Sequence, residues 1–102
     1  GDGSSAAAGY SGATNPMCLG GFTGASSTAN VFGAGVVDIL DYLSTSKYKT
    51  VRSLDGRDVN GSGYIFFESG LWQSTSAISQ IDITCVAGNF AQYTHFALYG
   101  IK

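Results

Sequence analysis

The chain has a single histidine, His95, and seven carboxylates, which are the side chains that acid–base or nucleophilic catalysis would require first. No serine lies in the G-x-S-x-G turn of a serine hydrolase, because the strings GYSGA and NGSGY both miss that spacing. We therefore expect no enzymatic activity and interpret His95 as a strand residue at a sheet edge or subunit contact. The alternative is a glycan-cleaving enzyme, which needs two carboxylates facing each other across a sugar cleft.

The stretch SLDGRDVNGSGY, residues 53–64, carries the clearest local pattern for a bound ion. Asp58, Asn60 and Ser62, followed by Gly63, match the first half of a calcium-binding loop. The second half fails, because position twelve is Ser69 where a bidentate glutamate is required. Asn-Gly pairs also supply the positive φ angles of a hairpin turn. We favour a turn and keep calcium as a weak alternative; no other cofactor is expected.

Aromatic side chains are the remaining candidates for recognition. Tyr64, Trp72 and Tyr93 could together stack on a sugar or host receptor, with His95 nearby in sequence to the last of them. Tyrosine and tryptophan also bury a large area while satisfying one polar atom, which suits a sandwich core or a subunit interface. We favour core or interface, and exposure of the three aromatic residues on one surface would indicate carbohydrate contact.

The elements that must position these residues are predicted to be strands. Short runs rich in β-branched and aromatic residues, bounded by Gly, Asn, Asp and Ser, begin at Val31. Ile81, Ile83 and Cys85 alternate with Asp82 and Thr84, as in a strand with one buried face. A helical stripe over residues 36–43 is the one local alternative. The predicted strands cover residues 31–42, 47–54, 63–69, 77–86 and 95–101, which indicates an all-β antiparallel sandwich.

Length and composition predict one domain over residues 1–102, mostly loop in 1–30 and rich in strands in 31–102. Only 12% of the residues are charged and the net charge is −2, which argues against a nucleic-acid partner because phosphate binding needs clustered Lys or Arg. No run approaches the roughly 20 apolar residues that span a bilayer. Cys18 and Cys85 could form one disulfide, but we interpret both as ordinary small apolar residues.

Five or six strands, the sixth a short one around residues 17–22, are few for a jelly roll, which uses about eight. We therefore expect the chain to be the C-terminal part of a longer protein, with a sandwich completed by upstream strands or by a neighbouring chain. Its last segment is expected to form a core strand anchored by Phe90, Phe96, Leu98 and Tyr99, so that deletion of residues 97–102 would abolish folding.

Three motifs give the sequence a family resemblance: K-x-K-T at residues 47–50, G-x-W-x-x-T-x-A-I at residues 70–78, and the closing G-N-F…F-A-L-Y-G-I. With these motifs the chain resembles the C-terminal part of tailed-bacteriophage structural proteins, and because Asp38-Ile39-Leu40-Asp41-Tyr42 and the opening GDGSS also fit, the likeness covers nearly its whole length. Thr94-His95 departs from the small residues common there. The resemblance implies a jelly-roll-like sandwich at the virion surface, in a tail fibre or capsid decoration protein, and no catalytic residues. The expected partners are copies of the chain, as a trimer, other virion proteins, and a host glycan or receptor at a fibre tip.

Overall fold

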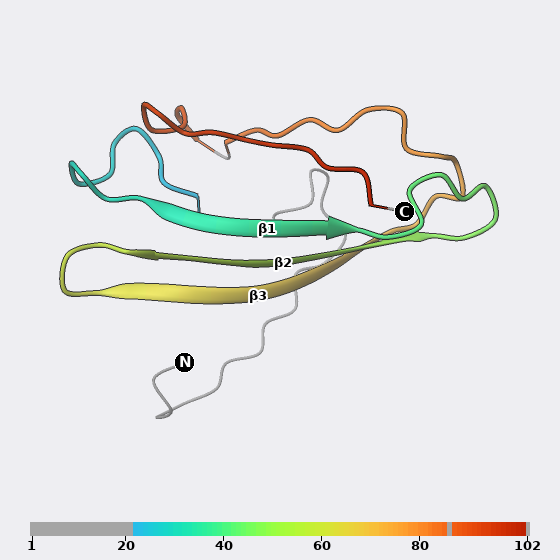
Figure 1. Ribbon diagram of the computed structural model, residues 1–102, viewed down its shortest axis with the longest axis horizontal. Helices are drawn as coiled ribbons and strands as arrows, with labels where there is room; N and C mark the ends of the chain where they lie inside the picture. Colours follow the sequence, from blue (N-terminus) through green and yellow to red (C-terminus); the bar gives the residue numbers. More distant parts are fainter. Residues whose placement is uncertain (1–21, 86, 102) are drawn as a thin grey trace, which may run out of the picture.

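The computed structural model of the chain describes residues 22–85 and 87–101. Three antiparallel strands, β1 (Gly33–Ile39), β2 (Lys49–Asp58) and β3 (Gly63–Trp72), form one sheet in the order β1-β2-β3 (Figure 1). The described residues contain no helix, and hence none long and apolar enough to cross a membrane. The all-β class and the first three predicted strands are confirmed. The helical alternative for residues 36–43 is wrong, because residues 36–39 belong to β1 and residues 40–43 form a turn.

The β2–β3 connection is a two-residue hairpin turn. Asn60 and Gly61 have φ angles of 61° and 101°, and the Val59 N–H donates to the Ser62 carbonyl over 2.7 Å. Two consecutive positive φ angles define the turn type whose twist matches that of the flanking strands. The Asn-Gly pair therefore fixes the register in which Asp58 lies opposite Gly63.

The central strand β2 has one covered and one uncovered face. Lys49, Val51, Ser53 and Asp55 are buried, while the residues between them are exposed. Figure 1 shows residues 73–85 and 87–101, drawn orange to red, running as a second layer over the sheet. We call the buried side of the sheet the inner face and the opposite side the outer face.

Aromatic contacts join the second layer to the sheet. The ring of Phe96 packs edge-on against Phe90 and Phe22, with centroid separations of 5.1 and 6.0 Å. Phe22 lies over Gly35 of β1, where an added Cβ would come within 3.4 Å of the Phe22 ring and 2.9 Å of the Asp55 Cβ. The glycine therefore makes room for this packing. Within the described residues, Val31 and Val51 are the only buried apolar side chains.

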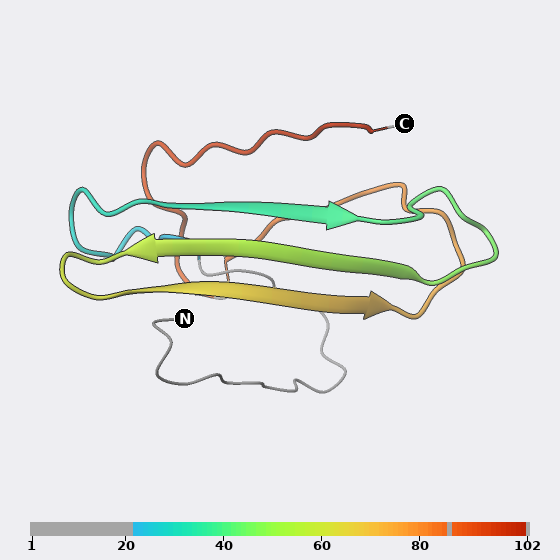
Figure 2. The same cartoon turned by 60° about the horizontal axis from the view of Figure 1, so that its bottom comes forward.

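The last two predicted strands do not form. Residues 77–85 and 95–101 have extended sequence patterns but join no ladder among the described residues. Figures 1 and 2 both place the terminal segment beside β1, yet β1 pairs only with β2. The prediction that Leu98 and Tyr99 anchor a core strand is wrong, because these side chains are 83% and 80% exposed. A sequence can favour the extended conformation, but a strand forms only when its backbone N–H and C=O groups pair with a neighbouring strand.

Two further expectations fall on the N-terminal part of the chain. The loop-rich stretch 1–30 is described only from Phe22 onward, where it forms turns and a single bridge between Gly24 and Phe90. Cys85 is a half-buried free thiol, while Cys18 lies outside the described residues.

Candidate interaction surface

The outer face of the sheet is an exposed apolar surface. The antiparallel register places Val36, Leu54 and Phe67 in one row across the three strands. The neighbouring row consists of Ala34, Gly56 and Ile65. Phe67 and Ile65 are 74% and 70% exposed, and Val36, Leu54 and Leu71 are each more than half exposed. Isolated apolar side chains are normal on a protein surface, but a contiguous group of this kind marks an interaction site.

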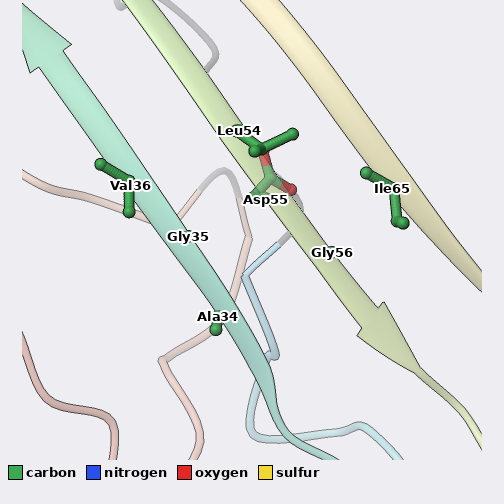
Figure 3. Close-up of a pocket in the computed structure, with 7 residues that line it drawn as sticks. All are labelled: Ala34, Gly35, Val36, Leu54, Asp55, Gly56 and Ile65. Atoms are coloured by element: carbon green, nitrogen blue, oxygen red, sulfur yellow. The ribbon is translucent and has the colours of Figure 1, made fainter.

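A shallow depression lies within this face (Figure 3). It has a volume of about 390 Å³ and is bordered by Ala34, Val36, Leu54 and Ile65. Gly56 forms its floor, because it has no side chain between Ala34 and Ile65 in the register. A Cβ at Gly56 would lie 2.8 Å from the Tyr64 carbonyl oxygen and 3.2 Å from Ile65 Cγ1. The depression is therefore built into the backbone of the sheet.

One ion pair stands beside the apolar rows. Arg52 Nε donates to Asp38 Oδ2 over 2.9 Å, across adjacent strands on the same outer face. The two side chains are 55% and 41% exposed, so the pair is solvated and contributes little to stability by itself. It makes this part of the outer face electrically neutral, with one acid and one base.

The two central motifs of the sequence meet in space at Lys49. This residue is fully buried, and its ammonium donates to the carbonyl oxygens of Ser44, Lys47, Ser74 and Thr75 at distances of 2.6 to 3.3 Å. The ammonium also lies 5.6 Å from the centre of the Trp72 ring. Lys49 belongs to K-x-K-T, whereas Trp72 and Thr75 belong to G-x-W-x-x-T. Lys49 therefore joins the loop before β2 to the loop after β3.

The predicted aromatic platform does not form as one surface. Tyr64 and Trp72 lie at opposite ends of β3, opposite Arg57 and Lys49 respectively. At about 3.3 Å per residue, this spacing separates them by roughly 26 Å. The Tyr64 ring packs against Phe66 and beneath the Arg57 guanidinium, with separations of 4.6 and 4.8 Å. Trp72 packs against the Lys49 ammonium, so both residues contribute to local packing.

Of the three predicted aromatic residues, Tyr93 has the most exposed side chain. It is 74% exposed, has a φ of 68°, and borders a pocket of about 320 Å³ together with Asn30 and Gln92. Thr23 lines the same pocket; its side chain is buried, and its hydroxyl has no hydrogen-bond partner within the described part of the chain. A non-glycine residue at positive φ is uncommon and often belongs to a functional site. His95, two residues further on, is exposed.

The predicted ion-binding residues lie in and beside the hairpin turn. Asp58 Oδ1 accepts a hydrogen bond of 3.0 Å from the Asn60 N–H, while Asn60 and Ser62 are exposed. Among the described residues, no three His, Cys, Asp or Glu side chains come together as a metal site. The turn accounts for the pattern by itself, and calcium binding stays a prediction.

The outer face was not predicted from the sequence, although one signal for it is present there. Residues 64–67, Tyr-Ile-Phe-Phe, are successive apolar residues at the beginning of β3. A strand that is apolar on both sides is typical of a sheet covered on both faces. Only the register then shows that Ile65 and Phe67 share a face with Val36 and Leu54.

Comparison with protein-family models, with curated proteins and with solved structures finds no match for this chain. The likeness to bacteriophage structural proteins therefore rests on the three sequence motifs alone.

Proposed function

We propose that this chain is a non-enzymatic structural component of a bacteriophage virion, on the surface of a tail fibre or as a capsid decoration. It assembles with copies of itself, as a trimer, and with other virion proteins. The observation that carries this proposal is the contrast between a described core of two apolar side chains, Val31 and Val51, and the many large apolar side chains left exposed. The phage assignment comes from the sequence motifs.

Exposed apolar side chains of this number favour association. They lie both on the outer face and along the terminal segment, where Leu98, Tyr99 and Ile101 are at least 80% exposed. Burying one such side chain contributes about 1.5–3 kcal/mol, which a chain gains when it packs against a neighbour. In the proposed assembly a neighbouring chain or upstream strands complete a jelly-roll-like sandwich around the β1–β2–β3 sheet.

Four of the six described carboxylates have local partners that favour a structural role over catalysis. Asp38 pairs with Arg52, Asp41 with Lys47, and Asp82 accepts both hydrogen bonds from the Gln80 amide. Asp58 stabilises its own turn. These carboxylates have local structural partners, whereas a glycosidase would hold two of them across a cleft.

The native mass of the chain tests assembly, and an antibody against the chain tests location. We expect a trimer in native mass spectrometry and antibody labelling of particles of the phage that encodes the chain. A monomer at every concentration would contradict the proposed self-assembly. Absence of the chain from purified particles would contradict the virion assignment.

A second candidate function is binding of a host glycan or receptor at a fibre tip, and the Tyr93 pocket favours it. An exposed aromatic ring beside amide and hydroxyl groups is suited to a sugar, whose faces stack on the ring while its hydroxyls form hydrogen bonds. Tyr93→Ala should abolish binding to a host polysaccharide, whereas Tyr99→Ala, at a comparably exposed tyrosine not among the residues that line the pocket, should leave it unchanged. Equal loss in both variants, or no binding by the wild type, would contradict this function.

A further inference from the structure

We infer that the outer face of the β1–β2–β3 sheet is the surface through which copies of this chain contact one another. This inference rests on the proposed self-assembly and assigns it to one side of the sheet. It concerns the face that carries Val36, Leu54, Ile65, Phe67 and Leu71, and not the terminal segment.

The size of the face fits a contact between copies. Side chains of this kind have roughly 150–200 Å² of surface each. The exposed fractions of the five apolar residues therefore leave on the order of 500 Å² of apolar surface, at the upper end for a monomer. Asp38, Arg52, Thr50 and Ser69 lie on the same face. They bring the available area near the ~800 Å² that each partner buries in a stable interface.

The charges on the face favour a second copy over an acidic or basic partner. Asp38 and Arg52 are the acid and the base in one cross-strand row, so the row has no net charge. When two such faces meet, each Asp38 can approach Arg52 of the neighbouring copy, and no like charges need be buried together. A strongly charged partner would find no complementary surface here.

The shape of the outer face is also suited to contact with the same face of another copy. Phe67 is its most exposed large side chain, while the depression above Gly56 is open and bordered by apolar atoms (Figure 3). A projection and a hollow on the same surface allow identical faces to interlock in a symmetric assembly. In a trimer the three faces turn toward a common three-fold axis, so that Phe67 of one copy meets the hollow of the next.

The first experiment compares native masses of the full chain and two variants. Phe67→Asp places a charge in the centre of the face, and we expect it to yield monomers. Leu43→Asp is the matched control, because Leu43 is 66% exposed and lies in the loop between β1 and β2, outside the face. It should assemble like the wild type. Circular dichroism of each variant shows whether the sheet is retained.

The second experiment uses charge reversal and does not depend on removing an apolar side chain. Asp38→Arg makes the row doubly positive, and Arg52→Asp makes it doubly negative, so each variant alone should assemble at least tenfold more weakly. Mixing the two should restore part of the assembly, because two of the three contacts in a mixed trimer pair opposite charges, and the restored species should contain both chains, which differ in mass. Restoration cannot come from the pair within one chain, because neither variant has an acid and a base there.

The outcomes separate this inference from the proposed function. If the wild type assembles but Phe67→Asp assembles equally well, copies contact one another elsewhere and only this inference is wrong. If the wild type is a monomer, self-assembly itself is wrong. A monomeric wild type that Phe67→Asp destabilises would mean that another segment of the same chain covers the face, which also contradicts the inference. Failure of the mixed charge variants to associate would contradict it independently.

Discussion

Among the described residues, Lys49 is a buried lysine that has no carboxylate partner there. Its ammonium has three N–H donors, and the surrounding carbonyl oxygens of two loops supply four acceptors. Hydrogen bonds to a charged group are stronger than neutral ones, which offsets the cost of burying the charge. Lys49 therefore holds the loops at one end of the sheet in place of an apolar core.

Lys49→Met should lower the free energy of unfolding by about 2–4 kcal/mol, because the loop carbonyls lose a charged donor. The measurement is denaturant unfolding followed by the fluorescence of Trp72, the only tryptophan and a neighbour of the ammonium. Lys47→Met is the control, since Lys47 forms only an exposed pair with Asp41 and should cost less than about 1 kcal/mol. An equal loss of unfolding free energy in the two variants would show that the buried hydrogen bonds of Lys49 stabilise the fold no more than the exposed pair of Lys47.

The hairpin glycine gives a second prediction at this scale. Gly61 has a φ of 101°, and a Cβ there would meet nothing within 4 Å, so substitution costs only backbone strain. Gly61→Ala should lower stability by roughly 1–2 kcal/mol. Gly100→Ala is the matched control, because its surroundings are equally open and its φ is not positive. A thermal midpoint that falls equally in both variants would contradict this account of the turn.

At the scale of elements, the sequence predicted the β1–β2–β3 sheet because its signals are local. Asn60-Gly61 determines the hairpin, and the β-branched and aromatic runs on both sides supply its strands. Residues 77–85 and 95–101 carry the same kind of run, but pairing is a property of two segments together. The alternation Ile81-Asp82-Ile83 indicates that one face of the segment could be buried. It does not indicate which other segment would cover that face. The candidate surface was missed for the same reason, since it needs the register of three strands.

The terminal segment gives a prediction that reverses the expectation from sequence. Deleting residues 97–102 should retain the sheet and cost less than about 1 kcal/mol, because Leu98, Tyr99 and Ile101 are almost fully exposed. Phe96→Ala should cost more, about 1–3 kcal/mol, since it removes the edge-on contacts with Phe22 and Phe90. Circular dichroism and thermal unfolding of both variants check this. Loss of the cooperative transition after the deletion would mean that the segment belongs to the core.

At the scale of the whole molecule, the central strand buries polar side chains beside Val51 on the inner face, while the outer face is mainly apolar. Lys49, Ser53 and Asp55 are buried beneath the second layer, while Leu54 and Phe67 face outward. A chain that folded only for itself would gain more from the opposite arrangement, because apolar burial is the main favourable term in folding. The proposed contact with another copy would explain why the apolar face is left uncovered, while on the inner face the Lys49 ammonium bonds to loop carbonyl oxygens.

The proposed dependence on neighbouring copies should make thermal stability vary with protein concentration. In a trimer, a tenfold increase in concentration adds about 1 kcal/mol per chain, which corresponds to a rise of roughly 4 °C or more in the unfolding midpoint. Scanning calorimetry at three concentrations measures this rise for the wild type and for Leu43→Asp. Phe67→Asp should unfold at one temperature throughout, because its face no longer binds a copy. A midpoint that is independent of concentration in the wild type would show that the apolar face contributes nothing to the stability of the folded chain.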